Sequence, residues 1–243
     1  MISAVAVVVP ARDEEDAIAH CTHGLRRALE VVPEAIRSAA CVVVDRSRDG
    51  TREVLQQEAP FVRQFVNTHE LPLGAVRDAG VQAMLAELGS PPAHTWVLHT
   101  DADSVVPPDW ILTHLQYAST GAHAVAGLTT IGNWSSHKEH TRQPYDNLVN
   151  ERIHNGWHKH VYGANLGVRA DAYHHVGGFR PLHSGEDHDL WHRLHAADFR
   201  LMQPCESPVL TSARTVGRAS GGLADLLRTL GNEDSTPRPD KAA

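Results

Sequence analysis

The sequence predicts an α/β protein with a single Rossmann-like domain, in which helices flank a mostly parallel central sheet. Over the first half, short apolar runs alternate with segments of helical periodicity, which is the pattern of βαβ units. Three of these runs are followed by aspartates, at the strand ends where open α/β sheets bind ligands. The length of 243 residues, with 42% hydrophobic and 21% charged residues, suits one soluble domain with a sizeable core.

The elements of the first half are predicted in order from these patterns. Apolar runs predict strands at 4–10, 39–45, 61–67, 95–100 and 122–130. Apolar residues at helical spacing predict helices at 13–32, 50–59, 74–88 and 107–118. Acidic residues open the first of these helices, and prolines open the last.

The second half is less regular. Residues 131–160 are polar, with one helical stretch near 144–155. The pattern of 163–179 predicts a strand, a short helix and a Gly-Gly turn. The pattern of 185–199 predicts a helix that begins with acidic residues. The polar, proline-containing segment 231–243 is expected to be disordered.

Composition excludes several classes of protein. A formal net charge of -7 argues against a general nucleic-acid binder, which needs a basic face. Cys21, Cys41 and Cys205 form neither a disulfide framework nor a CxxC zinc site, which fits a reducing, cytoplasmic location. The apolar N-terminus lacks a basic region and is interrupted at Pro10, and no run approaches the ~20 residues of a membrane span. We therefore expect no signal peptide and no transmembrane segment.

The acidic residues after the strands are the main candidates for chemistry. Asp13, Asp45, Asp101 and Asp103 would gather along one rim of a parallel sheet. A polar loop or a helix cap explains any one of them. The pair at 101 and 103 points the same way in an extended chain and repels unless a cation lies nearby. Hard oxygen ligands without cysteine suit Mg²⁺ or Mn²⁺, which fill their shells with water and substrate phosphates. We therefore expect a nucleoside diphosphate bound through a metal at Asp103, with Asp101 beside it.

Two classes of enzyme carry Asp-x-Asp after a strand, and both remain open from the residues alone. In a phosphotransferase or phosphatase of the haloacid dehalogenase type, Asp101 would be the nucleophile, although that motif usually ends the first strand. In a nucleotide-sugar glycosyltransferase, the aspartates would bind the donor. A third hypothesis is a nucleotide-sugar-binding module without transfer activity.

Six segments, in order, resemble family 2 glycosyltransferases of the GT-A fold over most of the chain. These segments are "VVVPARDEEDAI", "VVVDRSRDGT", "GAVRDAG", "TDADSVVPPDW", "GANLGVRADAYHHVGGF" and "GEDHDLWHRL". Two features depart from the pattern. Arg46-Ser47-Arg48 replace the small or acidic residues that are usual after the second strand, and the chain ends soon after residue 230. We therefore expect transfer of one sugar rather than processive synthesis.

The resemblance implies a metal-dependent, inverting hexosyltransferase that moves a sugar from a nucleotide donor, UDP- or GDP-linked, to an acceptor hydroxyl on a small molecule, lipid or glycan. It implies one domain at 1–230, with a nucleotide-sugar-binding half at 1–130 and an acceptor and catalytic-base half at 131–230. Mn²⁺ or Mg²⁺ would bind at Asp103 and Asp101. The expected donor-binding residues are Pro10, Ala11, Arg12, Asp13, Glu14, Asp45, Arg77, Asp101, Ala102 and Asp103.

The same resemblance places the catalytic base in the acidic pair at the start of "EDHDL". We expect Asp187 in this role, with Glu186 second, while Asp189 pairs with Arg193 one turn later. The acceptor-side candidates are Asn165, Trp134, Trp157 and His188, and Tyr162 falls in the same irregular region.

Arginines and histidines supply the remaining candidates. Arg214 and Arg218 either approach the diphosphate or are ordinary helix-flanking charges. The 18 histidines include His154 and His158, which would share one face of a helix, and a stripe at His188, His192 and His195. No HExxH pattern is present, so we expect surface histidines rather than a zinc site.

Overall fold

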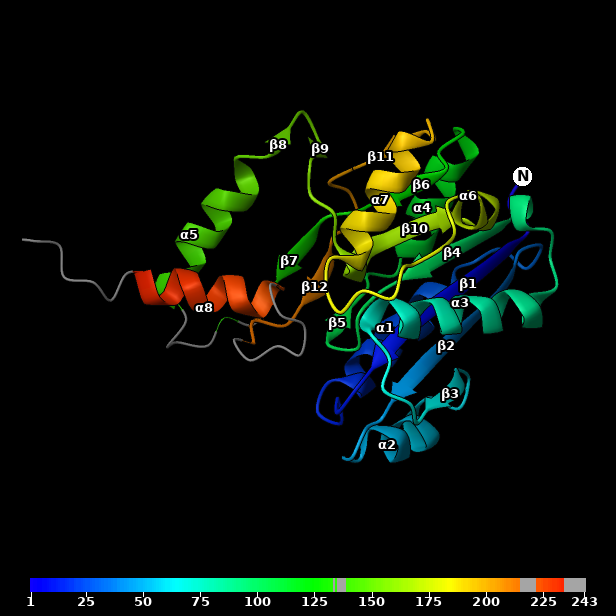
Figure 1. The fold of residues 1–243 in the computed structure, drawn as a ribbon, viewed down its shortest axis with the longest axis horizontal. Coiled ribbons are helices and arrows are strands. Elements are labelled where there is room, and N and C mark those ends of the chain that lie inside the picture. The colour runs from blue at the N-terminus through cyan, green and yellow to red at the C-terminus, as the bar shows by residue number, and fades with distance from the viewer. Residues whose placement is uncertain (133, 135–138, 215–221, 234–243) are drawn as a thin grey trace, which may run out of the picture.

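A computed structural model describes residues 1–132, 134, 139–214 and 222–233 of the chain. A seven-stranded sheet runs through the main body of the protein (Figure 1). Its strands, in spatial order, are β11 (Leu201–Met202), β6 (Ala124–Ala126), β10 (Leu166–Arg169), β4 (Thr95–His99), β1 (Ala4–Ala11), β2 (Arg37–Asp45) and β3 (Arg63–Asn67).

The sheet is mostly parallel, as the sequence predicts. β1 pairs in parallel with both β2 and β4, and β2 pairs in parallel with β3. β10 is the exception, because it runs antiparallel to β4 and β6 between them. The carboxyl ends of β1, β2 and β4 therefore meet at one edge of the sheet, and the predicted acidic residues follow or end these strands.

Helices cover both faces of this sheet (Figure 1). One core lies between the sheet and the helices α1 (Ile18–Glu30), α2 (Thr51–Glu58) and α4 (Trp110–Ser119). The other lies beneath α3 (Leu73–Leu88), α6 (Ala170–His175) and α7 (Glu186–Ala196). Successive strand residues point to opposite faces, so Val7 and Val9 enter the first core and Val8 the second. Burial on both sides explains why β1 and β2 are continuous apolar runs.

The single strand predicted at 122–130 is wrong, because the chain changes sheet within it. β6 ends at Ala126, and β7 (Thr129–Ile131) joins a second sheet in the order β5 (Ser104–Val105), β12 (Val209–Thr211), β7. Gly127 lies at the change of sheet. A Cβ atom built there would lie 2.3 Å from the side chain of Asn165, so only glycine fits without a shift.

A third cluster lies outside the main sheet, where α5 (Glu139–Asn150) packs on α8 (Leu223–Glu233). Figure 1 shows these two helices at one side of the molecule, away from β1 and β2. The helix predicted near 144–155 ends at Asn150, and a hairpin of β8 (Ile153–His154) and β9 (Trp157–His158) follows it. His154 and His158 therefore lie on paired strands rather than on one face of a helix.

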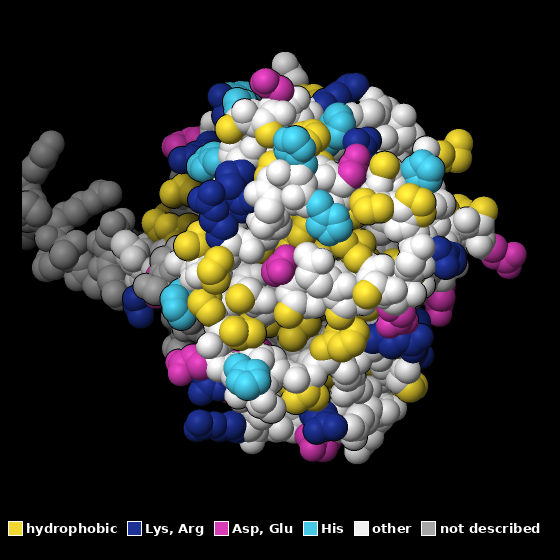
Figure 2. All heavy atoms as spheres, turned by 45° about the vertical axis from the view of Figure 1, so that its right-hand side comes forward, with side chains coloured by type: hydrophobic (Ala, Val, Ile, Leu, Met, Phe, Trp, Pro, Cys, Tyr) yellow, Lys and Arg dark blue, Asp and Glu magenta, His cyan; other side chains and the backbone are white. Residues whose placement is uncertain are grey.

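Three further expectations can be compared with the described residues. None of their helices is both long and apolar enough to cross a membrane. Helix α8 continues to Glu233, so the first residues of the segment expected to be disordered are helical, and 234–243 lie outside the described part. The described residues contain no group of three or more histidine, cysteine or acidic side chains that could hold a metal. On the face drawn in Figure 2, histidines are spread over the surface rather than gathered in one cluster.

Candidate active site

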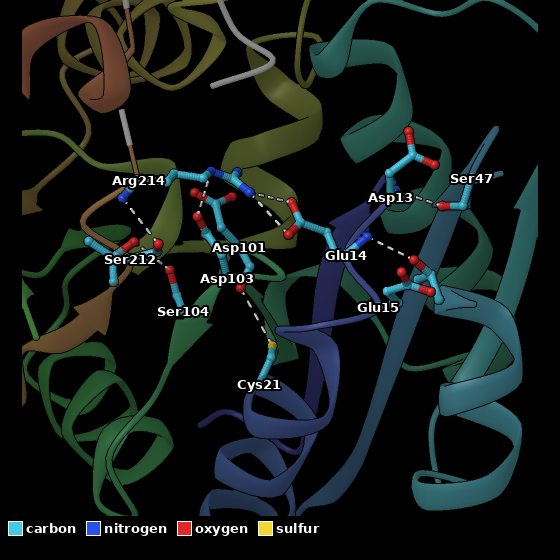
Figure 3. A network of polar contacts seen from close by, with 12 residues as sticks. Asp13, Glu14, Glu15, Cys21, Ser47, Asp101, Asp103, Ser104, Ser212 and Arg214 are labelled. Atoms are coloured by element: carbon cyan, nitrogen blue, oxygen red, sulfur yellow. Dashed lines mark hydrogen bonds and ion pairs between the residues drawn. The ribbon is translucent and has the colours of Figure 1, made fainter. Parts of the chain in front are cut away.

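Each aspartate of the Asp-x-Asp motif pairs with an arginine. Oδ1 of Asp101 lies 2.6 Å from Nη2 of Arg77, and Oδ2 of Asp103 lies 3.0 Å from Nε of Arg214. Nη1 of Arg214 also donates to both carboxylate oxygens of Glu14, at 2.8 and 3.0 Å (Figure 3). The repulsion expected between the two aspartates is therefore balanced by guanidinium groups that come from other parts of the chain.

The local electrostatics favour a cation beside Asp103. Burial raises the pKa of Asp103 to about 6; Arg214 opposes this shift, and the neighbouring charges of Asp101 and Glu14 add to it. The motif supplies hard oxygen ligands, which suit Mg²⁺ or Mn²⁺. These ions need only one or two protein carboxylates when phosphates and water complete their shell, so Asp101 and Asp103 fit such an ion.

A cavity of about 210 Å³ opens at the carboxyl ends of the parallel strands. Most of the predicted donor-binding residues line it, namely Pro10, Ala11, Arg12, Glu14, Asp45, Asp101, Ala102 and Asp103. Sequence reasoning missed Leu71, Leu73, Val76 and His183, which also line it. The first three are ordinary apolar residues of a loop and a helix, and only the fold brings them to the cavity. We call this space the donor cavity, after the residues that the sequence predicts to bind a donor.

Asp45 ends β2 at the wall of the donor cavity, where its side chain is buried. Its Oδ1 accepts a hydrogen bond from Nδ2 of Asn67, at 2.7 Å, across the parallel pairing of β2 and β3. A second bond from the same amide nitrogen reaches the carbonyl of His69. Asn67 thus holds the carboxylate of Asp45 in a fixed orientation at the rim.

Asp13 is predicted to bind the donor, but it is not among the residues that line the donor cavity. Its Oδ1 accepts the backbone N–H of Arg48 at 2.7 Å, and its own N–H donates to Oγ of Ser47 at 3.0 Å. Figure 3 shows Asp13 beside Ser47, apart from the pair at 101 and 103. Asp13 therefore ties the loop after β1 to the loop after β2, including the Arg-Ser-Arg segment that departs from the family pattern.

A second cavity, of about 490 Å³, adjoins the first. The two share Leu73, Asp101, Asp103 and Arg214 in their linings. The second cavity extends to the acidic start of α7 and to the helices α5 and α8, and we call it the acceptor-side cavity. Its lining includes Arg77, Thr129, Tyr145, Leu148, Val149, His160, Tyr162, Glu186, Asp187, His188, Leu223 and Leu226.

Glu186 and Asp187 are neighbours in sequence but lie in different surroundings. Glu186 is 3% exposed, and its Oε1 accepts from Nε of Arg77 at 3.0 Å. Burial raises the pKa of Glu186, and the charge of Arg77 opposes the rise. Asp187 is more exposed, and its Oδ2 accepts the backbone N–H of Gly163 at 2.7 Å. Of the two, Asp187 is therefore the more accessible to a molecule in the cavity.

Arg77 links the Asp-x-Asp motif to the first turn of α7, because it pairs with both Asp101 and Glu186. Burial acts to lower its pKa, but the carboxylates of Asp101 and Glu186 outweigh burial and raise it, so the guanidinium stays charged. Arg77 lines the acceptor-side cavity rather than the donor cavity. The predicted pairing of Asp189 with Arg193 is also present, with Nη2 of Arg193 at 2.6 Å from the carboxylate.

Two of the predicted acceptor-side residues, Asn165 and Trp157, lie away from the cavity. Asn165 is 1% exposed, and its Oδ1 accepts from Nε1 of Trp110 at 2.8 Å while its Nδ2 donates to the carbonyl of Leu128 at 2.9 Å. Trp157 packs edge-on against Tyr117, with 6.0 Å between ring centroids. Neither residue lines the acceptor-side cavity; Asn165 satisfies buried groups, and Trp157 belongs to the β8–β9 hairpin.

The other acceptor-side candidates lie at or beside the cavity. His188 lines it directly. Trp134 does not line it but packs on Tyr145, which does, with 6.0 Å between centroids. Tyr162 stacks on His160 at 5.4 Å, and both line the cavity. Sequence reasoning missed Tyr145 and His160, because neither stands in a recognisable motif. Arg218 lies outside the described residues.

The fold is of the GT-A type, with one cavity at the carboxyl ends of the parallel strands and a second cavity beside it. The family model for "Glycosyl transferase family 2" matches residues 6–180, and the chain belongs to this family. No curated protein sequence matches the chain.

Two solved structures show the same fold. One is the mannosyltransferase PcManGT from Pyrobaculum calidifontis in complex with GDP-Man and Mn²⁺, with a TM-score of 0.66 and 16% identity over 88% of this chain and 58% of that one. Another is residues 1–349 of S. aureus TarS in complex with UDP-GlcNAc, with a TM-score of 0.66 and 13% identity over 95% of this chain and 65% of that one. The chain thus spans less than two thirds of the length of either.

Proposed function

We propose that this protein transfers one sugar from a nucleoside diphosphate sugar to an acceptor hydroxyl, with inversion at the anomeric carbon and with the help of a divalent cation. The observation that carries the proposal is the pair of adjoining cavities. Asp101, Asp103 and Arg214 lie in the wall that they share, and Asp187 lines only the acceptor-side cavity. A donor in one cavity and an acceptor in the other would therefore come together beside these shared residues, each from its own side.

In the donor cavity, the residues bind and orient the nucleotide. Asp45, held by Asn67, can accept an N–H group from the edge of a uracil or guanine base. Asp101 and Asp103 would hold Mn²⁺ or Mg²⁺. When bound, this ion neutralises the negative charge that develops on the leaving diphosphate.

In the acceptor-side cavity, Asp187 has the role of general base. A base must lie within hydrogen-bond reach of the attacking hydroxyl and away from the leaving group. Asp187 meets the second condition because it is absent from the donor cavity. Glu186 is less suited, since it is buried and its carboxylate is engaged by Arg77. Attack from the side of Asp187 on a sugar held from the donor side inverts the anomeric centre.

The relatives support the class of donor. GDP-Man and UDP-GlcNAc are bound in the two structures described above, and Mn²⁺ is present with the first. A UDP- or GDP-linked hexose is therefore the donor that we propose, with Mn²⁺ or Mg²⁺ as the ion. A cytoplasmic location is part of the same proposal, supported by free thiols at Cys21, Cys41 and Cys205.

One experiment tests the function against its alternatives. The protein is incubated with a panel of UDP- and GDP-sugars, Mn²⁺ and candidate acceptor alcohols, and released nucleotide and covalently bound phosphate are both measured. Nucleotide release that depends on acceptor supports transfer. Phosphate bound to Asp101 would instead support the phosphotransferase hypothesis, which the family assignment does not favour. Saturable nucleotide-sugar binding without turnover would indicate a binding module.

A further inference from the structure

Arg214 lies where the two cavities meet. Its side chain lines both of them, together with Asp101, Asp103 and Leu73. In sugar transfer, the bond that breaks joins the sugar to the diphosphate, so the diphosphate lies between the nucleoside, on the donor side, and the sugar that the acceptor attacks. The position of Arg214 therefore matches that of the leaving group in the proposed function, on which this inference rests.

Strand pairing fixes the backbone of this residue. β12 pairs antiparallel with β5, with Thr211 opposite Ser104, and Oγ of Ser104 donates to Oγ1 of Thr211 at 3.0 Å. Just after β12, the N–H of Arg214 donates to Oγ of Ser212 at 3.2 Å (Figure 3). Because β5 begins directly after Asp103, this pairing brings Arg214 beside Asp103 although the two residues are far apart in the sequence.

The two arginines of the site differ in their freedom to move. Arg77 is 2% exposed and is held by Asp101 on one side and Glu186 on the other. The side chain of Arg214 is 35% exposed, whereas its partners Glu14 and Asp103 are only 9% and 10% exposed. The guanidinium of Arg214 thus contacts two buried carboxylates from the solvent side. It can move away from them without disturbing the packing of the core.

We propose that Arg214 is a diphosphate-binding residue and that it competes with the divalent cation for Asp103. Without donor, its guanidinium pairs with Oδ2 of Asp103, one of the two oxygens through which this carboxylate would bind the cation, and its positive charge repels the ion. Phosphate oxygens offer a guanidinium a planar, two-point partner, so a bound diphosphate attracts Arg214 away from Asp103. The diphosphate thus frees Asp103 for the cation, and the cation in turn displaces Arg214 toward the diphosphate. Donor and cation therefore bind cooperatively.

The test measures binding rather than turnover. Mn²⁺ affinity is measured from the electron paramagnetic resonance signal of the free ion, with and without UDP and GDP, for the wild type and for Arg214→Gln. In the wild type, nucleotide should raise Mn²⁺ affinity by about fivefold or more, the usual scale of coupled binding. In Arg214→Gln, Mn²⁺ alone should bind about fivefold tighter, and nucleotide in the presence of Mn²⁺ should bind about tenfold more weakly.

Two further variants sharpen the result. Arg214→Lys keeps a cation, so it should retain nucleotide binding better than Arg214→Gln. Arg63→Gln removes another exposed, ion-paired arginine, which is partnered by Glu87 on the outer strand, and should change neither affinity. Circular dichroism tests whether each variant is folded.

The outcomes are distinct. Mn²⁺ affinity that is unchanged or lower in folded Arg214→Gln would overturn the competition, and an unchanged nucleotide affinity would overturn the role in diphosphate binding. A wild type that binds neither UDP nor GDP in the presence of Mn²⁺ would overturn the donor site itself, and with it the proposed function.

Discussion

The Nε atom of Arg77 lies 3.0 Å from Oε1 of Glu186, and the two side chains are only 2% and 4% exposed. This buried pair joins α3 to the first turn of α7. Replacing Arg77 by Met leaves a buried carboxylate without its guanidinium. We expect the free energy of unfolding to fall by about 3–5 kcal/mol, the usual effect of breaking a buried ion pair. Urea denaturation measures the change.

The double variant Arg77→Met with Glu186→Leu is the matched control. It removes the stranded carboxylate together with the cation, so part of the lost stability should return. If Arg77→Met alone unfolds at the urea concentration of the wild type, the pair does not contribute to stability as argued.

Asp187→Asn should lower transfer by about 10²–10⁴-fold, the usual contribution of a general base. Nucleotide and Mn²⁺ binding should stay near the wild type, because Asp187 does not line the donor cavity. Initial rates and equilibrium binding separate the two effects. Asp189→Asn is the matched control, since Asp189 pairs with Arg193 and is not among the cavity-lining residues. Full turnover in Asp187→Asn with loss in Glu186→Gln would move the role one residue back.

Asp103→Ala should abolish metal-dependent nucleotide-sugar binding while the protein stays folded. The carboxylate lies in the wall shared by both cavities, where it would hold the cation. Isothermal titration calorimetry with a nucleotide sugar, in the presence and absence of Mn²⁺, measures the effect. Removal of the metal from the wild type by EDTA should weaken donor binding in the same way. An affinity in the variant that still depends on Mn²⁺ would contradict this role.

Asp45→Ala should weaken nucleoside diphosphate binding by about tenfold or more. A hydrogen bond to a charged carboxylate contributes roughly 1.5–3 kcal/mol, and about 1.4 kcal/mol corresponds to one decade. Asn67→Ala should produce a smaller loss, because it only releases the orientation of Asp45. Binding titrations with the free diphosphate compare the variants. Equal affinities for the wild type and Asp45→Ala would mean that Asp45 is structural.

His114 should make the protein sensitive to acid. Burial lowers its pKa to about 4, although its hydrogen bond to Asn165 opposes the shift, whereas an unfolded histidine titrates near about 6.5. Between these values the unfolded chain binds a proton that the folded chain does not, so stability falls as the pH falls from about 6.5 to 4. His114 alone should lower the free energy of unfolding by about 2 kcal/mol when the pH falls from 7 to 5.

The variant His114→Gln tests this effect, because its amide can still donate to Asn165 but cannot titrate in this range. Unfolding free energies are measured by urea denaturation at pH 7 and at pH 5. The difference between the unfolding free energies at pH 7 and pH 5 should be smaller in His114→Gln than in the wild type by about 2 kcal/mol. An identical pH dependence in both proteins would show that His114 is not one of the responsible groups.

The fold and the rim of the site were predictable because both follow from local signals. The continuous apolar runs of β1 and β2 indicate strands buried on both faces, and aspartates at strand ends indicate the ligand-binding edge. The change of sheet at Gly127 was not predictable, because nothing in "AHAVAGLTT" says that Asn165 will fill the space beside it. The same holds for β10, whose antiparallel pairing depends on partners distant in sequence.

In the site, too, contacts between residues distant in sequence were not predictable. Asp13 is predicted as a donor contact because it lies in an acidic loop, yet it forms hydrogen bonds with Ser47 and Arg48 of the neighbouring loop and does not line the donor cavity. Asn165 and Trp157 have side chains suited to a sugar, but Asn165 is buried and hydrogen-bonded to Trp110, and Trp157 packs on Tyr117 and is otherwise exposed, away from the cavity. Arg214 could be read either way from the sequence. Only the pairing of β12 with β5 puts it beside Asp103, and a pattern search along the chain does not detect such a pairing.

The place of β10 limits how the chain can be divided. Because β10 separates β4 from β6, a fragment that ends near residue 130 would hold both neighbours but lack the strand between them. Without β10, one edge of β4 would expose unpaired backbone N–H and C=O groups. Such an edge, on a strand of buried apolar residues, promotes association with other chains. During translation, the same gap stays open until residues 166–169 have left the ribosome, so a nascent chain stalled before that point would be a natural substrate for chaperones.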